Sequence, residues 1–160
     1  MASVRDLLRK KEKGVWTTTP DMLVSDAVQL MVERNVGALV VTDDERKVIG
    51  IVTERDLVRK LLRRKKTPEQ TRIEEIMSSK ALCVTPEYTV DACMSLMNDN
   101  QIRHLPVVEH ERLVGIVSVR DVVRTIVSEQ EFMIMQLEDY IMACPPHLKS
   151  EQTMVVSEVA

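Results

Sequence analysis

Two short motifs combine a hydroxyl with a carboxylate at the same spacing. Thr53 lies three residues before Asp56, and Ser118 lies three residues before Asp121. Each motif follows an apolar Ile-Val run and opens a further apolar segment, which predicts a place where a strand turns into a helix. A hydroxyl and free backbone N–H groups at a helix start attract phosphate, because those N–H groups lack intrahelical partners and the dipole is positive there. The same residues also fit a capping box, which only stabilises the helix start, so the motif alone leaves both functions open.

The two motifs belong to a longer internal repeat. Residues 19–31 recur as 85–97 with an offset of 66, and residues 49–58 recur as 114–123 with an offset of 65. This difference predicts that one residue is lost in one copy between these segments, where a hairpin loop would tolerate it. In each copy, apolar residues at i, i+3 and i+4 predict a helix, and two β-branched runs around a few polar residues predict a hairpin. Each copy is therefore expected to run strand, helix, strand, strand, helix.

These elements predict an α/β fold in which two copies complete one core. One copy has too small a sheet to close a core alone, so we expect the copies to pack sheet to sheet about a pseudo-twofold axis. After the second copy, apolar residues recur every three or four positions as far as Pro145-Pro146, which predicts one long helix over residues 122–142. The expected segments are an N-terminal helical segment (1–14), the first repeat (15–66), a linker with a short helix (67–81), the second repeat (82–127), and a C-terminal helix and tail (128–160).

With the repeat established, the motifs resemble those of tandem cystathionine-β-synthase (CBS) domain pairs. They are the Thr-Pro that begins each copy, the Gly-Ile-Val-[Thr/Ser]-x-x-Asp segment, and Ile-Arg-His-Leu-Pro-Val-Val at residues 102–108. The resemblance covers residues 15–127 with no catalytic domain attached, so the chain is similar to stand-alone pairs, also called Bateman modules. The family implies two clefts between the repeats and adenosine-containing ligands: AMP first, then ATP or ADP, NAD or NADH, and S-adenosylmethionine. Members of the family commonly form homodimers.

The resemblance also assigns residues to the two clefts. Each combines the Thr/Ser-x-x-Asp of one repeat, whose Asp binds ribose, with the Thr-Pro and the central strand of the other. One cleft would consist of Ile51, Thr53, Asp56, Thr85, Arg103, His104 and Pro106. The other would consist of Thr19, Pro20, Gly37, Ala38, Ile116, Ser118 and Asp121. Further contacts to adenine or phosphate are expected from Trp16, Arg55 and Arg120.

The two clefts are expected to differ in charge. Arg103 and His104 give the first cleft a cation for phosphate, and Arg suits bidentate contact with phosphate oxygens. Their counterparts Gly37 and Ala38 bring no charge but leave room for a base or a bulkier nucleotide. Strand alternation allows only one of Arg103 and His104 to face inward if both lie in the strand.

Some of these residues also have an ordinary structural explanation. Trp16 fits a core aromatic as well as a ring that stacks on adenine. His104 fits a surface or core histidine. Arg55 and Arg120 fit water-facing residues of a first helical turn, and a long Arg120 side chain would reduce the room in the second cleft.

Composition argues against several classes of function. The 22 basic and 25 acidic residues leave a net charge of -3, which provides no global field for collecting nucleic acid or an anionic membrane. A basic stretch at residues 55–66 is a candidate nucleic-acid patch, but it lacks interleaved aromatic residues, which favours a solvated helix face. No apolar run has the length of a membrane span.

The cysteines and the N-terminus indicate a cytoplasmic protein. Cys83, Cys93 and Cys144 cannot all pair within one chain, and their neighbours are apolar or Pro, which predicts reduced thiols. No two of them form a CxxC pair, so no zinc site is expected. The Arg-rich, amphipathic start could also fit an organelle transit peptide, but Asp6 and Glu12 are unusual in one.

The sequence therefore predicts a non-catalytic regulatory module that binds an adenosine compound and modulates a partner protein. No Ser-His-Asp or Cys-His arrangement, metal cluster or Gly-rich phosphate loop accompanies the repeat, which argues against an enzyme. Two alternatives remain open: a ligand-free dimerising scaffold that docks a protein through its C-terminal helix, and a nucleic-acid binder that uses residues 55–66.

Overall fold

The chain divides into two units, and both sequence repeats lie in the first one as far as Val123. The computed structural model describes residues 1–12 and 14–143, and the chain divides into the units Met1–Val123 and Arg124–Ala160. The helices and strands are, in chain order, α1 (Val4–Lys10), β1 (Thr17–Thr18), α2 (Val24–Arg34), β2 (Ala38–Thr42), β3 (Val48–Thr53), α3 (Glu54–Asp56), the π-helix η1 (Leu57–Leu62), the 3₁₀-helix η2 (Ile73–Glu75), α4 (Val90–Asn100), β4 (His104–Glu109), β5 (Arg112–Ser118) and α5 (Val119–Met142).

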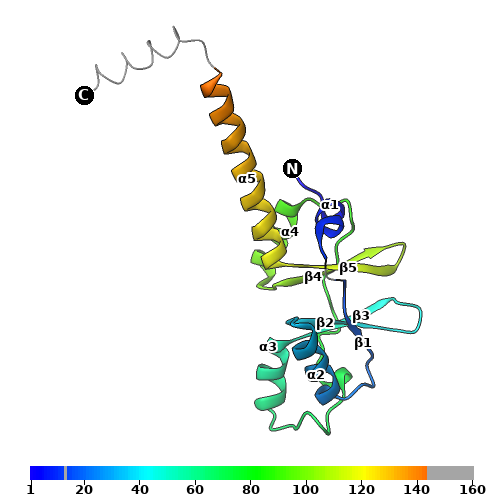
Figure 1. The fold of residues 1–160 in the computed structure, drawn as a ribbon. Coiled ribbons are helices and arrows are strands. Elements are labelled where there is room, and N and C mark those ends of the chain that lie inside the picture. The colour runs from blue at the N-terminus through cyan, green and yellow to red at the C-terminus, as the bar shows by residue number, and fades with distance from the viewer. Residues whose placement is uncertain (13, 144–160) are drawn as a thin grey trace. The chain divides into compact units, whose positions relative to one another are not determined.

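The two repeats form two small sheets that face each other. Figure 1 shows β1–β3 in one sheet and β4–β5 in the other, with α2 and α3 outside the first and α1 and α4 outside the second. All five residues of β2 are buried, and Leu39 and Val41 among them share a core with apolar residues of α2 such as Val24 and Met31. The α/β fold with two packed repeats is thus confirmed.

The second repeat has a shorter first strand than expected. In the first repeat, β1 pairs in parallel with β2, which pairs antiparallel with β3. In the second, the segment before Thr85 contributes only a parallel bridge between Val84 and Val107. The amide of Val40 donates to the Trp16 carbonyl in the first repeat, whereas Pro106 stands at the matching position and has no N–H to donate.

The one-residue difference between the repeats lies in the hairpin loop, as predicted. Thr42 pairs with Val48 across the first hairpin, and Val108 pairs with Leu113 across the second, so the second connection is one residue shorter. The two hairpins also meet, because the amide of Leu113 donates to the carbonyl of Arg46 at 3.0 Å.

Two segments expected outside the repeats, which contain α1 and η2, each cover one repeat. We call them the crossing segments, because the one that precedes the first repeat covers the second. The amide of Val4 donates to the Tyr88 carbonyl at 2.8 Å, and the amide of Ile73 donates to the Met22 carbonyl at 2.9 Å. Tyr88 and Met22 are equivalent in the 66-residue repeat, so α1 covers the second repeat in the way that the linker helix η2 covers the first. The same relation holds for the bonds from Val90 to Ala2, Val24 to Thr71, Arg5 to Pro86, and Glu74 to Pro20.

The two closing helices of the repeats differ. In the first repeat, the single turn of α3 continues into the π-helix η1, and in the second, α5 is a regular helix. The predicted C-terminal helix agrees with α5, whose residues from Arg124 belong to the second unit; Pro145-Pro146 lies outside the described residues. Within the described part of the chain, no helix is both long and apolar enough to cross a bilayer.

Candidate functional site

Thr53 and Asp56 form a complete capping box at the start of α3. The amide and the hydroxyl of Thr53 donate to Asp56 Oδ2 at 2.9 and 3.2 Å, and the amide of Asp56 donates to Thr53 Oγ1 at 3.4 Å. Thr53 ends β3, so the strand fixes the position of the cap. Asp56 is only 9% exposed, and its Oδ1 atom takes no part in the cap.

Ser118 and Asp121 repeat this geometry at the start of α5. The amide and the hydroxyl of Ser118 each donate to Asp121 Oδ2 at 2.9 Å, and the amide of Asp121 donates to Ser118 Oγ at 3.3 Å. The capping interpretation of the motif is therefore confirmed in both repeats. It does not exclude ligand binding, because a carboxylate has about four acceptor sites.

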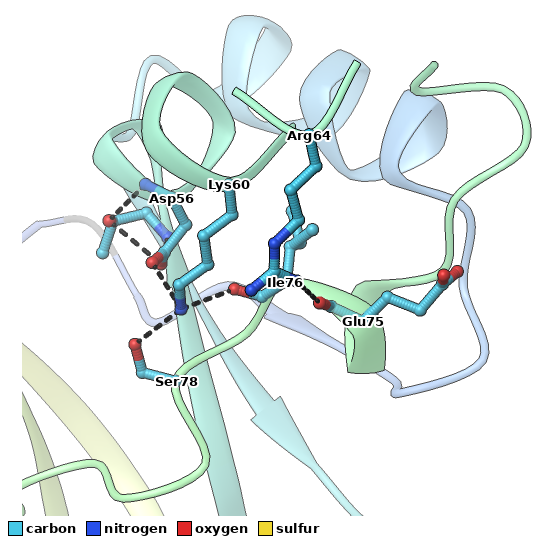
Figure 2. Close-up of polar contacts among 7 residues, drawn as sticks. Asp56, Lys60, Arg64, Glu75, Ile76 and Ser78 are labelled. Atoms are coloured by element: carbon cyan, nitrogen blue, oxygen red, sulfur yellow. Dashed lines mark hydrogen bonds and ion pairs between the residues drawn. The ribbon is translucent and has the colours of Figure 1, made fainter. Parts of the chain in front are cut away.

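A lysine pairs with Asp56 in the first repeat. Figure 2 shows Lys60 with its ammonium group between the carboxylate of Asp56, the carbonyl of Ile76 and the hydroxyl of Ser78. Lys60 Nζ lies 3.1 Å from Asp56 Oδ1, 2.9 Å from the Ile76 oxygen and 3.4 Å from Ser78 Oγ. The hydrogen bonds from Lys60 to Ile76 and Ser78 thus attach the helix of the first repeat to the segment that leads from the linker into the second.

A different lysine pairs with Asp121. Lys11 Nζ lies 2.8 Å from Asp121 Oδ2 and donates to the carbonyl of Ile116, also at 2.8 Å. Burial raises the pKa of Asp121, but the hydrogen bonds from Lys11 and Ser118 outweigh this effect and hold the pKa below its ordinary value. The sequence analysis assigned Ile116 and Asp121 to a cleft but missed both lysines.

His104 lies where the two repeats meet. It is half-buried at the start of β4, opposite Ser118, and a Cβ at Gly37 would lie 3.8 Å from His104 Cε1 and 3.4 Å from Glu54 Oε2. We assigned His104 to the cleft of Asp56, whereas the structure places it beside Gly37 and within electrostatic reach of Asp121.

Two positively charged side chains, those of Lys11 and Arg103, act on His104. Burial, Lys11 and Arg103 lower its pKa, and the opposing effect of Asp121 is smaller. The imidazole is therefore expected to be neutral near pH 7. Arg103 itself precedes β4 and is exposed, and its carbonyl accepts the amide of Val119 at 2.9 Å. Two permanent cations, Lys11 and Arg103, thus lie near this ring.

The two Thr-Pro motifs form turns. Thr19 and Thr85 are exposed, and their carbonyls accept the amides of Met22 and Tyr88. The Thr19 hydroxyl lowers the pKa of Asp21 by hydrogen bonding. Arg5 lowers the pKa of Glu87 most, and the Thr85 hydroxyl adds to that effect. Both predicted hydroxyls are therefore engaged within their own turns. Pro20, at the first turn, is half-buried.

Most of the remaining residues that we predicted to contact a ligand make contacts within the protein or are buried. The guanidinium of Arg34 lies over the Trp16 ring, 4.1 Å from its centroid, and Trp16 packs against the first core. Arg55 Nη1 donates to the carbonyl of Gln101 at 2.8 Å, a contact between the repeats, whereas Arg120 is exposed. The backbone of Ile51 bonds to Ser78 in both directions. Ala38 and Pro106 are buried, so they offer a ligand little surface.

Comparison with known proteins identifies the family. The family model for the CBS domain matches residues 4–63 and, a second time, residues 73–128. This chain belongs to the CBS domain family. The two CBS matches begin at residues 4 and 73, so they include the crossing segments that cover the two sheets.

Relatives and solved structures agree with this result. CBS domain-containing protein CBSX3, mitochondrial, of Arabidopsis thaliana is 39% identical over 148 residues, which cover 87% of this chain and 71% of that protein. The CBS-domain containing protein ATU1752 from Agrobacterium tumefaciens is 35% identical with a TM-score of 0.73, over 78% of this chain and 98% of that chain. The CBS domain pair of MJ0100, in complex with 5'-methylthioadenosine and S-adenosyl-L-methionine, is 27% identical with a TM-score of 0.71, over 81% of this chain and 98% of that chain.

The basic stretch of the first CBS repeat holds the linker. Lys60 binds the Ile76 carbonyl, Arg64 Nη1 donates to the Glu75 carbonyl at 3.4 Å (Figure 2), and Lys66 pairs with the Glu75 carboxylate at 2.6 Å. Three of the basic side chains thus make contacts within the chain, two of them at its surface, which gives them a structural role.

Two of the three cysteines lie within the described residues. Cys93 is buried and Cys83 is exposed, and both are free thiols. Desolvation by the surrounding protein raises the pKa of each thiol, for Cys83 although part of the residue stays exposed. Cys144 lies outside the described residues. Among residues 1–12 and 14–143, no group of three His, Cys, Asp or Glu side chains could hold a metal ion.

Proposed function

We propose that this CBS-domain pair is a regulatory module that binds an adenosine-containing ligand between its repeats and modulates a partner protein. The observation that carries the proposal is the duplicated carboxylate: Asp56 and Asp121 stand at equivalent helix starts, each within reach of hydrogen-bond donors. The bound nucleosides of the MJ0100 pair support the class of ligand. AMP is our first candidate, followed by ATP or ADP, NADH and S-adenosylmethionine.

We also propose that the effect of binding is regulatory. A ligand held by both repeats would favour the arrangement to which it binds more tightly, and a partner that recognises this arrangement would respond. We propose a cytoplasmic location as well, although the Arabidopsis relative is named mitochondrial.

Calorimetric titration with AMP, ATP, NADH and S-adenosylmethionine tests the proposal. We expect at least one ligand to bind, and we expect Asp56→Ala or Asp121→Ala to weaken that binding roughly tenfold or more, because each removes charge-assisted hydrogen bonds. Asp91→Ala is the matched control, since Asp91 is an exposed carboxylate in the first turn of α4.

Two results would count against the proposal. Silence across the whole panel, after confirmation that no nucleotide copurified, would leave the ligand-free scaffold as the better function. Binding that is unaffected by either aspartate substitution, in variants whose thermal unfolding shows that they fold, would mean that the ligand uses other residues.

An exposed apolar face on α5 supports a further part of the proposal, homodimerisation. The face comprises Val123, Val127, Met133, Ile134, Leu137, Tyr140 and Ile141, all of which are exposed large apolar residues at helical spacing. It would serve equally in the scaffold function, where it would dock an effector protein.

A further inference from the structure

Each candidate ribose-binding carboxylate is neutralised by a lysine that the family motif does not contain. Lys60 reaches Asp56 from the next turn of the same helix, and Lys11 reaches Asp121 from the N-terminal segment. The two lysines come from different places in the chain and reach equivalent carboxylates, Lys60 at Oδ1 of Asp56 and Lys11 at Oδ2 of Asp121. The position equivalent to Lys60 in the second repeat is Thr125, which cannot neutralise a carboxylate.

The charge of these lysines matters because the carboxylates are poorly solvated. The side chains of Asp56 and Asp121 are 12% and 18% exposed. A lone carboxylate in such a place repels an approaching phosphate, since little water screens it. A carboxylate and a lysine about 3 Å apart form a pair without net charge. The carboxylate in such a pair still has acceptor sites for hydroxyl groups.

We propose that Lys11 and Lys60 determine the charge class of the ligand, so that the clefts accept phosphate-bearing adenosine compounds. This inference rests on the proposed function. Without its lysine, each cleft loses one positive charge beside the aspartate and shifts its preference towards neutral or cationic adenosine compounds.

The two lysines act with different strength. Lys60 uses all three of its N–H donors, on Asp56, Ile76 and Ser78. Lys11 uses two, on Asp121 and Ile116, which leaves one donor within the described residues for a phosphate oxygen. Arg103 and Lys11 both act on His104, so the cleft of Asp121 is the more positive one and has the stronger preference for phosphate.

The test compares two probes that differ mainly in charge, AMP and 5'-methylthioadenosine. The quantity measured by calorimetry is the ratio of their dissociation constants, which cancels general losses of affinity. We expect Lys11→Met or Lys60→Met, whichever serves the occupied cleft, to reduce the preference for AMP roughly tenfold, the order expected from one missing unit charge near a protein surface. Lys11→Arg and Lys60→Arg should largely retain it.

Matched controls separate a local effect from the net charge of the chain. Lys10→Met and Arg59→Met each remove one positive charge from an exposed neighbour and should leave the ratio unchanged. Should Lys60→Met fail to fold, Lys60→Gln keeps a donor for the Ile76 carbonyl and is the variant to measure.

The outcomes distinguish this inference from the proposed function. If the wild-type chain binds neither probe nor any other adenosine compound, the proposed function fails. If it binds the probes but the ratio stays within twofold in folded variants of both Lys11 and Lys60, the lysines do not select the ligand and the inference is overturned.

Discussion

Asp56 and Asp121 each serve the fold before any ligand arrives. Each accepts two hydrogen bonds from the residue that caps its helix and one ion pair from a lysine. These contacts leave further acceptor sites on each carboxylate, which can accept ribose hydroxyls. Structural capping and ligand binding are thus compatible uses of the same side chain.

The lowered pKa of Asp121 predicts how stability depends on pH. Because the folded pKa lies below the ordinary value of 3.8, the ionised side chain favours the folded state; this contribution is present above that value and lost as pH falls through the folded pKa. Asp121→Asn should therefore reduce the free energy of unfolding by about 1–2 kcal/mol at neutral pH, and by less once the pH falls through the folded pKa of Asp121.

Urea unfolding of both proteins across this pH range provides the measurement. Asp99→Asn, a change at an exposed aspartate of α4, is the control for the removal of one negative charge. A loss of stability in Asp121→Asn that stays constant from neutral to acid pH would show that the ion pair with Lys11 does not stabilise the fold.

The sequence identified the capping residues at this scale but not their cations. Thr53, Asp56, Ser118 and Asp121 stand in a short motif whose spacing predicts their contact. Lys11 and Asp121 are 110 residues apart, and only the folded chain brings them together. The ion pair between Asp56 and Lys60 could have been predicted, because the two residues have the i,i+4 spacing of a helical ion pair. It was missed because Lys60 was considered only as part of the basic stretch.

At the scale of elements, the crossing segments explain the glycines of the Gly-Ile-Val motif. A Cβ at Gly50 would lie 2.9 Å from both Met77 Sδ and the backbone oxygen of Ser78, and a Cβ at Gly115 would lie 2.7 Å from Leu8 Cδ2. Both glycines are buried, and each allows the segment that covers its sheet to approach closely.

The nature of these contacts predicts that Gly50→Ala costs more than Gly115→Ala. We expect Gly50→Ala to lower the free energy of unfolding by about 1–3 kcal/mol, since the backbone oxygen of Ser78 is held by its bond to Ile51. The flexible end of Leu8 can move, so Gly115→Ala should cost less. Gly14→Ala, where nothing lies within 4 Å of the added carbon, is the neutral control. Chemical denaturation measures all three, and an equal or larger loss for Gly115→Ala would contradict this explanation.

The elements of each repeat were predictable, whereas the crossing was not. Periodicity located α2, α4 and the two hairpins, and the missing residue was placed in the correct loop. The crossing segments escaped because they correspond at an offset of 69, whereas the repeat has offsets of 66 and 65, and because α1 and η2 share few identical residues. Pro106 could have indicated the shorter first strand of the second repeat, since a proline within a strand removes a ladder hydrogen bond.

At the scale of the whole chain, the crossing joins the two repeats into one cooperative structure. Val4 and Ile73 are fully buried. Val4 lies against the second repeat, and Ile73 lies against the first. Neither repeat could separate from the rest without exposing such residues to water. A ligand between the repeats would therefore act on a single folded unit rather than on two independent domains.

The exposed face of α5 leads to a prediction about the assembly of the whole chain. Ile134, Leu137 and Ile141 are each more than half exposed, and burying them against a second copy would be favourable by roughly 25 cal/mol per Å². We expect light scattering after size exclusion to give a dimer for the full chain and a monomer when these three residues are replaced by Glu. Met135→Glu is the control, because Met135 is 54% exposed but lies on the opposite, polar side of the helix.

Circular dichroism should show that the helix persists in each variant. A full chain that is monomeric, or a triple variant that stays dimeric, would exclude this face as the dimer contact; monomeric chains that still bind nucleotide would show that ligand binding needs only one copy.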